Sequence, residues 1–504
     1  MNSIFCIYVK IKSSEPQKRG NPPNCMAKTE GILPSIPPSI FRTIQFFYAS
    51  GQKRFKSGKD EYPMFKCPVS KQCGGCELLH VQYEKQAKLK QEQVQDLLDQ
   101  ARLKMTAMPP IMAETSMYYR NKVIYGFAKD KNKKVYSGLY APKSHRVIRT
   151  SGCAMQPKLV NDILDEITKL VDSMKIELYS PKTGTGLLRH VLIRYAQETD
   201  QVMVVFVTSR KEFPSRKNMV RALREKFPQI KTILQNVNPR DTSIVLQNET
   251  LILYGTGTIT DILCGLQITF GPSSFYQINH DQCQELYTKA RSMLQLKKTD
   301  TVLDTYCGVG TIGLVMAEDA KEVTGVELNK DAVENARLNA HSNEIENIRF
   351  LAMDSTRYMQ EAVRNHTHYD VIILDPPRAG TTRDFIQAAS RLNPEKILYI
   401  SCDPKTLVRD LVFFRQNGYT SKTVELVDMF PNTSHIESLV LLQKDPKAAK
   451  KPEKAGNANG GRAQRKPGPS CGNTKPESRP ARELNPYEKA LAEYKASLRN
   501  KRKK

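Results

Sequence analysis

The feature that most constrains the fold is a series of short apolar strands that alternate with helical segments after Thr299. The strands are expected at Thr301–Asp304, Glu322–Glu327, Ile348–Leu351, Asp370–Asp375 and Lys396–Ser401. Strands that alternate with helices form a parallel sheet with helices on both faces. Two more strands, near 421–428 and 436–443, are joined by a short loop and should run antiparallel. Residues 276–444 are therefore expected to form a Rossmann-like α/β domain with a mostly parallel, seven-stranded sheet.

Residues 64–275 are expected to form an α+β domain of their own. A long helix is predicted over Leu78–Leu103, where apolar residues recur at three- and four-residue steps. Short alternating stretches over residues 118–150 predict antiparallel strands. The other elements expected before Thr299 are a helix over Leu159–Met174, strands at 187–196 and 202–208, a helix at 215–226, strands within 231–270 and a helix over Asp281–Leu296.

Both ends of the chain are basic and lack a sustained apolar pattern. Of the formal net charge of +25, residues 1–63 carry +6 and residues 445–504 carry +11. We expect these segments to be a disordered basic N-terminal extension and a disordered basic tail. No apolar run approaches the roughly 20 residues that span a membrane, and the N-terminus does not have the pattern of a secretory signal. We therefore expect a cytoplasmic protein that is not attached to a membrane.

A glycine-rich loop follows the first strand of the α/β region, with the sequence Asp304-Thr-Tyr-Cys-Gly308-Val-Gly310-Thr-Ile-Gly313. Glycines let the backbone turn sharply and approach a ligand, and the helix that follows offers N–H groups at its N-terminus. Glu327 ends the next strand, where a carboxylate can accept hydrogen bonds from two ribose hydroxyls. This arrangement favours a bound ligand over a plain packed turn, and the ligand is either a dinucleotide or S-adenosylmethionine.

A second loop, Asp375-Pro-Pro-Arg378-Ala-Gly380, ends the fourth strand. Two consecutive prolines fix the backbone and remove its hydrogen-bond donors. A dehydrogenase has no need of such a loop, whereas a nucleic-acid methyltransferase has one between its cofactor and the target base. In methyltransferases that act on amino groups an aromatic residue follows the prolines. Arg378 occupies that position here, which disfavours chemistry on an exocyclic nitrogen.

A third loop, Ser401-Cys402-Asp403-Pro404, ends the fifth strand. A lone cysteine is more often a small buried hydrophobe than a nucleophile. Its position at the carboxyl edge of a parallel sheet, where ligands bind, favours a functional role. Glu437 begins the last strand. Taken alone, it would be interpreted as a solvated residue of an edge strand.

Three of the eleven cysteines lie within ten residues of one another, among glycines and a proline. The spacing is Cys67-x5-Cys73-x2-Cys76, and Cys153 lies further along the chain. Such a segment is poorly suited to a hydrophobic core, and its cysteines are well spaced to bind a metal. Four thiolates suit either zinc or a [4Fe–4S] cluster. A zinc ribbon usually has two Cys-x2-Cys pairs, so the three-plus-one arrangement favours an iron–sulfur cluster.

Five motifs, in this order, resemble those of the RNA uracil-5-methyltransferase family. They are Gly271-Pro-Ser-Ser-Phe-Tyr-Gln277-Ile-Asn279, Asp304-Thr-Tyr-Cys-Gly-Val-Gly310, Asp375-Pro-Pro-Arg-Ala-Gly380, Ser401-Cys-Asp-Pro404 and His435-Ile-Glu-Ser438. The resemblance covers about residues 64–444. It is greatest to the 23S rRNA type, which carries a [4Fe–4S] cluster on a Cys-x5-Cys-x2-Cys segment plus one later cysteine. Many members begin with a small RNA-binding β-barrel, but residues 1–63 show no run of alternating strands that could form one. RNA binding is therefore expected to fall to the middle domain, residues 64–275, with the basic tail as a further candidate.

The resemblance implies a class I methyltransferase fold and a role for each matching residue. By that resemblance, Cys402 is the nucleophile and Glu437 is the base that removes a proton. It implies that S-adenosylmethionine is bound by Gln277, Tyr306, Glu327 and Asp375, and leaves open whether Gln277 and Asp375 bind the methionine end of the cofactor or the edge of the target base. It also implies that the cluster is held by Cys67, Cys73, Cys76 and Cys153.

The implied reaction is methyl transfer from S-adenosylmethionine to C5 of a uridine in structured RNA, through a covalent bond between Cys402 and C6. The favoured substrate is 23S rRNA. The alternatives of the same class are tRNA uracil-5 and RNA cytosine-5 methylation, although a glutamate base suits uracil better. The alternative from another class is a non-catalytic Fe–S RNA-binding protein, which the intact Cys402–Glu437 pair disfavours. We expect RNA as the partner, no obligate protein partner, and a monomer.

Overall fold

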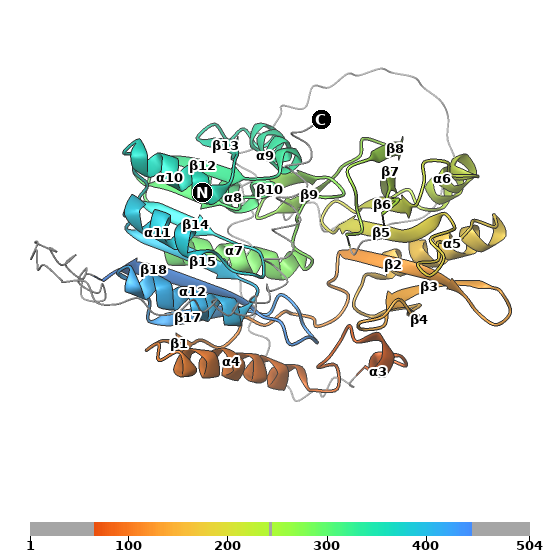
Figure 1. The fold of residues 1–504 in the computed structure, drawn as a ribbon, viewed down its shortest axis with the longest axis horizontal. Coiled ribbons are helices and arrows are strands. Elements are labelled where there is room, and N and C mark those ends of the chain that lie inside the picture. The colour runs from red at the N-terminus through yellow and green to blue at the C-terminus, as the bar shows by residue number, and fades with distance from the viewer. Residues whose placement is uncertain (1–64, 241–243, 446–504) are drawn as a thin grey trace, which may run out of the picture. The chain divides into compact units, whose positions relative to one another are not determined.

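The computed structural model describes residues 65–240 and 244–445, all within one compact unit. The predicted extension, residues 1–63, and all but the first residue of the predicted tail, residues 445–504, lie outside the described residues. Three sheets organise the described chain, with nine, seven and two strands (Figure 1). No helix in this part of the chain is long and apolar enough to cross a membrane. The predicted domain limits at 275 and 276 stay a prediction.

The nine-stranded sheet has the order β1-β17-β18-β15-β14-β11-β12-β13, and β16 also pairs with β18. Its bounds are β11 Thr301–Thr305, β12 Glu322–Glu327, β13 Ile348–Ala352, β14 Val371–Leu374, β15 Lys396–Ser401, β17 Thr423–Val427, β18 Glu437–Lys444, and the short β1 Thr106–Ala107 and β16 Tyr419–Thr420. Strands β11 to β15 run parallel, whereas β18 runs antiparallel to β15 and β17. The seven predicted strands are confirmed, and β1 and β16 are additions that the sequence did not predict.

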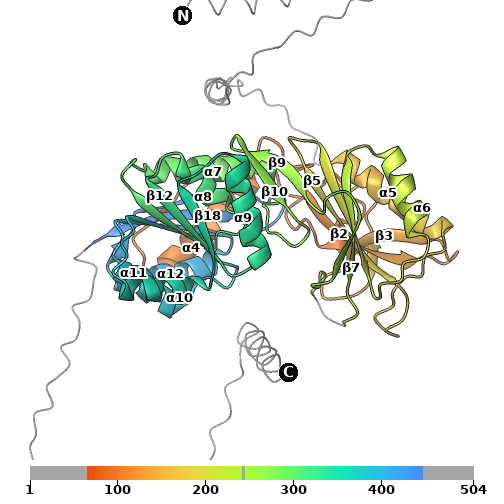
Figure 2. The same ribbon diagram turned by 90° about the horizontal axis from the view of Figure 1, so that it is seen from above.

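Helices cover both faces of this sheet (Figure 2). One face packs against α7 His280–Leu294, α8 Thr311–Ala317 and α9 Lys330–Ser342. The other packs against α4 Tyr83–Gln100, α10 Ser355–Arg364, α11 Arg383–Leu392 and α12 Pro404–Gln416. Alternation along the strands sorts side chains between the two cores: in β14, Val371 and Ile373 face the first core, and Ile372 and Leu374 face the second.

Helix α4 is shorter than the predicted Leu78–Leu103. Gln82 at its N-cap is extended, with φ −55° and ψ 142°. Just before it, the N–H of Leu78 donates to the carbonyl of Asn432 at 3.0 Å, in a distant loop. The residues before Tyr83 therefore make tertiary hydrogen bonds instead of a further helical turn.

The seven-stranded sheet has the order β4-β3-β2-β5-β6-β7-β8. Its bounds are β2 Lys122–Lys129, β3 Val135–Tyr140, β4 Val147–Arg149, β5 Leu188–Ala196, β6 Gln201–Thr208, β7 Ile230–Val237 and β8 Thr250–Tyr254. Helices α5 Lys158–Ser173 and α6 Arg216–Lys226 pack on one face. Strands β6 and β7 run parallel because α6 crosses between them. The antiparallel strands predicted over 118–150 are confirmed.

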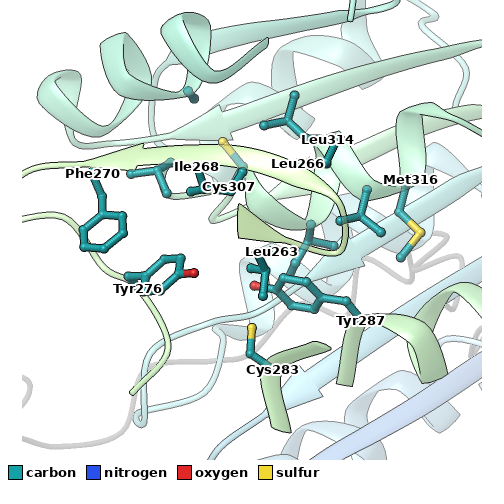
Figure 3. Close-up of a cluster of buried hydrophobic side chains, with 14 of the residues drawn as sticks. Leu263, Leu266, Ile268, Phe270, Tyr276, Cys283, Tyr287, Cys307, Leu314 and Met316 are labelled. Atoms are coloured by element: carbon teal, nitrogen blue, oxygen red, sulfur yellow. The ribbon is translucent and has the colours of Figure 1, made fainter. Parts of the chain in front are cut away.

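A two-stranded hairpin, β9 Ile259–Leu263 and β10 Leu266–Phe270, joins the two larger sheets. Its apolar side chains pack with Cys283 and Tyr287 of α7 and with Leu314 and Met316 of α8 (Figure 3). The same core includes Leu192 and Ala196 of β5, on the face of the seven-stranded sheet opposite its helices. The two larger sheets therefore share one apolar core.

Candidate active site

The glycine-rich loop lies between β11 and α8, at the carboxyl edge of the parallel strands. Tyr306, Gly308 and Gly310 all have left-handed backbones, with φ of 61°, 56° and 84°. A Cβ on Gly310 would lie 2.7 Å from the Phe350 ring, so both the conformation and the close packing require glycine there. The loop thereby turns sharply at the edge where ligands bind in such sheets.

Glu327 and Tyr306, two predicted cofactor contacts, lie at this loop. The Glu327 carboxylate accepts hydrogen bonds from the N–H of Gly308 at 3.2 Å and of Asn329 at 2.8 Å. These bonds fix the carboxylate at the end of β12. The Tyr306 ring stacks on Phe385, with 5.5 Å between the ring centroids. Its hydroxyl lies 3.5 Å from Thr381 Oγ1, in the loop that follows Asp375.

Asp304 is a buried acid that the sequence motif contained but to which we assigned no role. Its Oδ2 accepts a hydrogen bond from the N–H of Gly313 at 2.9 Å, while Oδ1 has no hydrogen-bond partner among the described residues. Burial, with the nearby charges of Asp375 and Glu327, raises the pKa of Asp304 to about 8. Its place as the first residue of the motif is the signal that could have identified it.

Strand pairing brings Cys402 and Glu437 together. Ser401, the last residue of β15, lies opposite Ser438 of β18, so Cys402 and Glu437 are the next positions along this antiparallel pair. Asp375 follows β14, the neighbour of β15 on the other side. Electrostatic interactions link all three side chains. Three residues predicted from separate motifs therefore meet at one edge of the sheet.

The acids at this edge are electrostatically unusual. Glu437 is 2% exposed, and its Oε2 has no hydrogen-bond partner in the described part of the chain. Burial and the charge of Asp375 hold the pKa of Glu437 well above its usual range, and Arg378 opposes this shift. Burial also raises the pKa of Asp375. An unsatisfied buried carboxyl is costly, and such groups concentrate at functional sites.

The Cys402 thiol is half-buried beside these acids. Burial, together with Glu437 and Asp375, raises the pKa of Cys402 to about 12, while Arg378 acts in the opposite direction. Arg378 therefore favours the charged forms of both Cys402 and Glu437. A negative charge that develops on either group would be stabilised by this one guanidinium.

Gln277 lies in the loop that enters α7, and the seven-stranded sheet holds that loop in place. Asn121 Nδ2 donates to the Gln277 carbonyl at 2.9 Å. Arg194 of β5 donates to the carbonyl of Pro272 at 3.1 Å and to that of Ser274. Sequence reasoning missed Arg194 and Asn121. Arg194 follows the apolar run Val191-Leu-Ile193 within the predicted strand 187–196, and this was the available signal, because a buried arginine requires partners.

The loop is also tied to the edge that carries Glu437. Asn279 Nδ2 donates to the carbonyl of Met429 at 3.2 Å. One turn into α7, the charges of Asp375 and Glu437 act on the buried thiol of Cys283. The structure thus places all six residues predicted for catalysis and cofactor binding at or beside one edge of the nine-stranded sheet.

The four cysteines of the predicted metal site come from two segments. Cys67, Cys73 and Cys76 lie at and around the short helix α3 Ser70–Cys73, and Cys153 lies between β4 and α5. All four are free thiols, and electrostatic interactions among them raise the pKa values of Cys73, Cys76 and Cys153 in addition to the larger effect of burial. No group of three or more His, Cys, Asp or Glu side chains in the described residues is arranged to hold a metal ion.

Hydrogen bonds join the cysteine segments to the loop that precedes Glu437. Asn432 in that loop is 2% exposed and has φ 66°. Its side chain accepts from Gln86 Nε2 at 3.1 Å, donates to the Ser116 carbonyl at 2.7 Å and lies 3.7 Å from Met155 Sδ. Glu77, next to Cys76, accepts from the N–H of Ser434 at 3.0 Å.

Comparison with known proteins gives consistent matches over most of the chain. A family model described as tRNA (Uracil-5-)-methyltransferase matches residues 82–445. A protein of Clostridium tetani described as an uncharacterized RNA methyltransferase is 36% identical over 377 residues, which cover 75% of this chain and 82% of that protein. One of Oceanobacillus iheyensis with the same description is 38% identical over 373 residues, which cover 73% and 81%.

One solved structure shares the fold over most of both chains. The Pyrococcus abyssi tRNA (uracil-54, C5)-methyltransferase, solved in complex with S-adenosyl-L-homocysteine, matches with a TM-score of 0.60 and 24% sequence identity. The match covers 73% of this chain and 85% of that one. It confirms the predicted architecture of a Rossmann-like methyltransferase domain with an additional α+β region.

Proposed function

This chain belongs to the tRNA (uracil-5-)-methyltransferase family, and we propose that it transfers a methyl group from S-adenosylmethionine to C5 of a uridine in structured RNA. The observation that carries the proposal is the meeting of Cys402 and Glu437 at the β15–β18 edge, beside Asp375. A nucleophile and a buried base at one ligand-binding edge suit a reaction that needs both. A non-catalytic RNA-binding protein would have no use for this costly pair.

C5 of uracil is too weak a nucleophile to take a methyl group unaided, and this is why the reaction needs both Cys402 and Glu437. Cys402 first loses its proton to solvent, its thiolate Sγ then attacks C6, and the electron pair of the C5–C6 double bond moves to make C5 electron-rich. Bound S-adenosylmethionine would supply the methyl group that C5 takes, and would leave as S-adenosylhomocysteine when its methyl–sulfur bond breaks. Glu437 then removes the proton from C5, the double bond re-forms, and Cys402 leaves. The raised pKa of Glu437 makes its carboxylate a stronger base than a solvated glutamate.

We propose that Gln277, Tyr306, Glu327 and Asp375 hold S-adenosylmethionine. Glu327 is fixed by two backbone N–H groups at the end of β12, where it can accept bonds from ribose hydroxyls. Tyr306 lies in the glycine-rich loop after β11, where its ring stacks on Phe385. Asp304, below the loop, keeps one carboxylate oxygen without a partner among the described residues. The fixed carboxylate of Glu327 and the unpartnered carboxylate oxygen of Asp304 both lie at this loop, and they support a polar ligand there.

We also propose that Cys67, Cys73, Cys76 and Cys153 hold a [4Fe–4S] cluster. The support is that thiols from two distant segments interact electrostatically with one another. A four-iron cluster binds each thiolate through a different iron, so its ligands need not converge on one point as they do around a single ion. Such a cluster would join residues 67–76 to the segment that carries Cys153 and contribute to folding.

The cysteine spacing supports 23S rRNA as the substrate RNA. The second candidate is tRNA, which is named both in the description of the family model and in that of the Pyrococcus enzyme. The target uridine must be single-stranded or flipped out of its stack, because Cys402 and the methyl donor approach the ring from different positions. Mass spectrometry of rRNA and tRNA from a deletion strain tests the proposal: it should find one or more uridines that have lost a C5 methyl group. A full set of 5-methyluridines in that strain would contradict it.

A further inference from the structure

A basic groove of about 640 Å³ lies on the seven-stranded sheet, between α6 and the edge strand β8. Its polar lining is formed by five basic side chains, Lys211, Arg216, Lys217, Arg221 and Arg224. No acidic side chain is among the described residues that line it. The groove belongs to a different sheet from Cys402, and the chemistry proposed above makes no use of it.

The sequence of α6 concentrates positive charge on one exposed face. Lys217, Arg221 and Arg224 recur at four- and three-residue steps, which align side chains along a helix. Met219 and Leu223 on the opposite face are fully buried against the sheet. The helix is therefore held by its apolar face while its cations point away from the core.

The first turn of α6 carries charges of the sign that a helix N-terminus disfavours. Arg216 and Lys217 occupy this turn, no acidic residue accompanies them, and Ser215 at the N-cap has φ 60° and makes no side-chain capping bond. The N–H groups at this end point out of the helix, and the helix dipole already makes the end positive. A bound anion would neutralise the positive charge of the side chains in the first turn and that of the helix end. The groove beside this turn is lined by three further basic side chains.

We propose that this groove binds the phosphodiester backbone of the substrate RNA, at nucleotides away from the target uridine; this inference rests on the proposed function. The charge is complementary to a run of phosphates. The floor is formed by β8, whose Ile252 is 55% exposed and can pack against ribose. Phosphate contacts position an RNA without reading its sequence, which leaves selection of the uridine to the edge that carries Cys402.

Three of the five basic residues have partners in the structure. Arg224 lies 3.8 Å from the centroid of the Tyr254 ring, and Lys211 pairs with Glu249 at 3.5 Å. Arg221 Nη2 donates a hydrogen bond to Asn218 Oδ1 at 3.5 Å, within the same exposed turn of α6. Arg216, Lys217 and Arg221 are all exposed, so their substitution should leave the fold intact. These three are the residues to test.

The experiment compares the full-length enzyme with the triple variant Arg216→Gln, Lys217→Gln, Arg221→Gln. RNA binding is measured against salt concentration, with unmodified 23S rRNA and tRNA transcripts as probes. The variant should bind more weakly, and the slope of log Kd against log salt should fall by roughly two. Methyl transfer at saturating RNA should be unchanged. The matched control removes the same charge from exposed positions at and beside α4, in the triple variant Lys85→Gln, Lys88→Gln, Lys104→Gln. It should keep the wild-type slope of log Kd against log salt.

Three results would overturn the proposal: an unchanged slope in the groove variant, an equal fall in the control, or loss of binding to a polyglutamate probe while RNA binding stays normal. The last result would assign the groove to an acidic protein segment. Failure of the proposed function is a separate readout, since it is measured as the absence of C5 methylation by the wild-type enzyme on the same transcripts. Weakened RNA binding by the groove variant would stand in that case.

Discussion

The N–H of Leu78 donates a hydrogen bond to the carbonyl of Asn432, at 3.0 Å. Leu78 lies two residues beyond Cys76, and Asn432 lies five residues before Glu437. The side chain of Asn432 extends the connection to Met155, two residues beyond Cys153. Both cysteine segments are therefore joined to the loop that leads to the proposed base.

We expect Asn432→Gly to slow the release of product from the Cys402 adduct more than it weakens substrate binding. Glycine keeps the left-handed backbone, so the change removes only the buried side-chain hydrogen bonds. The free energy of unfolding should fall by about 1–3 kcal/mol. Under turnover, more enzyme should be held as a covalent complex with methylated RNA, measured on denaturing gels. Asn432→Asp, which keeps the acceptor for Gln86, is the control and should show a smaller effect. Equal adduct levels in both variants and wild type would contradict the connection.

Glu437→Gln should block the reaction after methyl transfer. Glutamine is close to isosteric with glutamate but cannot take the C5 proton, so attack by Cys402 and methylation still proceed. The variant should accumulate as a denaturation-resistant, RNase-sensitive band with methylated RNA. The double variant with Cys402→Ala should give no band, because no thioether can form. Normal turnover by Glu437→Gln would mean that this residue is not the base.

Activity should rise with pH. Cys402 must react as the thiolate and Glu437 as the carboxylate, and the pKa values of both groups are raised in the folded protein. The reactive forms are therefore scarce at low pH and grow as protons are removed. From about pH 6 to about pH 9, kcat/KM should climb by up to tenfold per pH unit where one ionisation limits the rate. Arg378→Gln should move the profile to higher pH, because Arg378 lowers both pKa values. A flat profile in both proteins would contradict these roles.

Protein purified without oxygen should be brown and contain about four irons per chain. Cys153→Ser should lose the colour and lower the melting temperature, because it removes the ligand that joins the second segment. Cys264→Ser is the matched control. Cys264 lies in the turn between β9 and β10, so this variant should leave the iron content unchanged. One zinc per chain with no visible absorption would show a structural metal site in place of the cluster.

Lys90→Met should be strongly destabilising. Lys90 Nζ lies 2.7 Å from Asp428 Oδ1, and the two side chains are 1% and 0% exposed. Removing one partner leaves a buried charge unpaired, which costs about 3–5 kcal/mol of unfolding free energy. The double variant Lys90→Met, Asp428→Leu should recover part of that loss. Lys88→Met on the same helix breaks only an exposed pair with Glu92 and should change the unfolding free energy by less than about 1 kcal/mol. Chemical denaturation measures all three.

Much of the nine-stranded sheet could be predicted because its strands are apolar runs separated by helices of regular period. Strand β1 could not, because its two residues carry no periodic signal and its partner β17 lies near the other end of the described chain. The residues of the site were predicted from motifs, but their meeting was not visible in the sequence. Cys402 and Glu437 lie side by side only because β18 inserts between β15 and β17. Arg194 was missed because its partners are backbone carbonyls of a distant loop.

The pairing of Lys90 with Asp428 also means that α4 cannot reach its final packing until the chain has been synthesised past Asp428. The two residues are 338 positions apart. At about 5–20 residues per second, a ribosome needs roughly 20 to 70 seconds between them. Throughout that interval Lys90 lacks its partner, and Val94 and Leu98, which are fully buried in the finished protein, gain their core only gradually as residues 303–442 are made. We therefore expect the nascent chain to expose the apolar face of α4 until those residues follow, and the yield of folded protein to fall in cells depleted of chaperones that shield such segments.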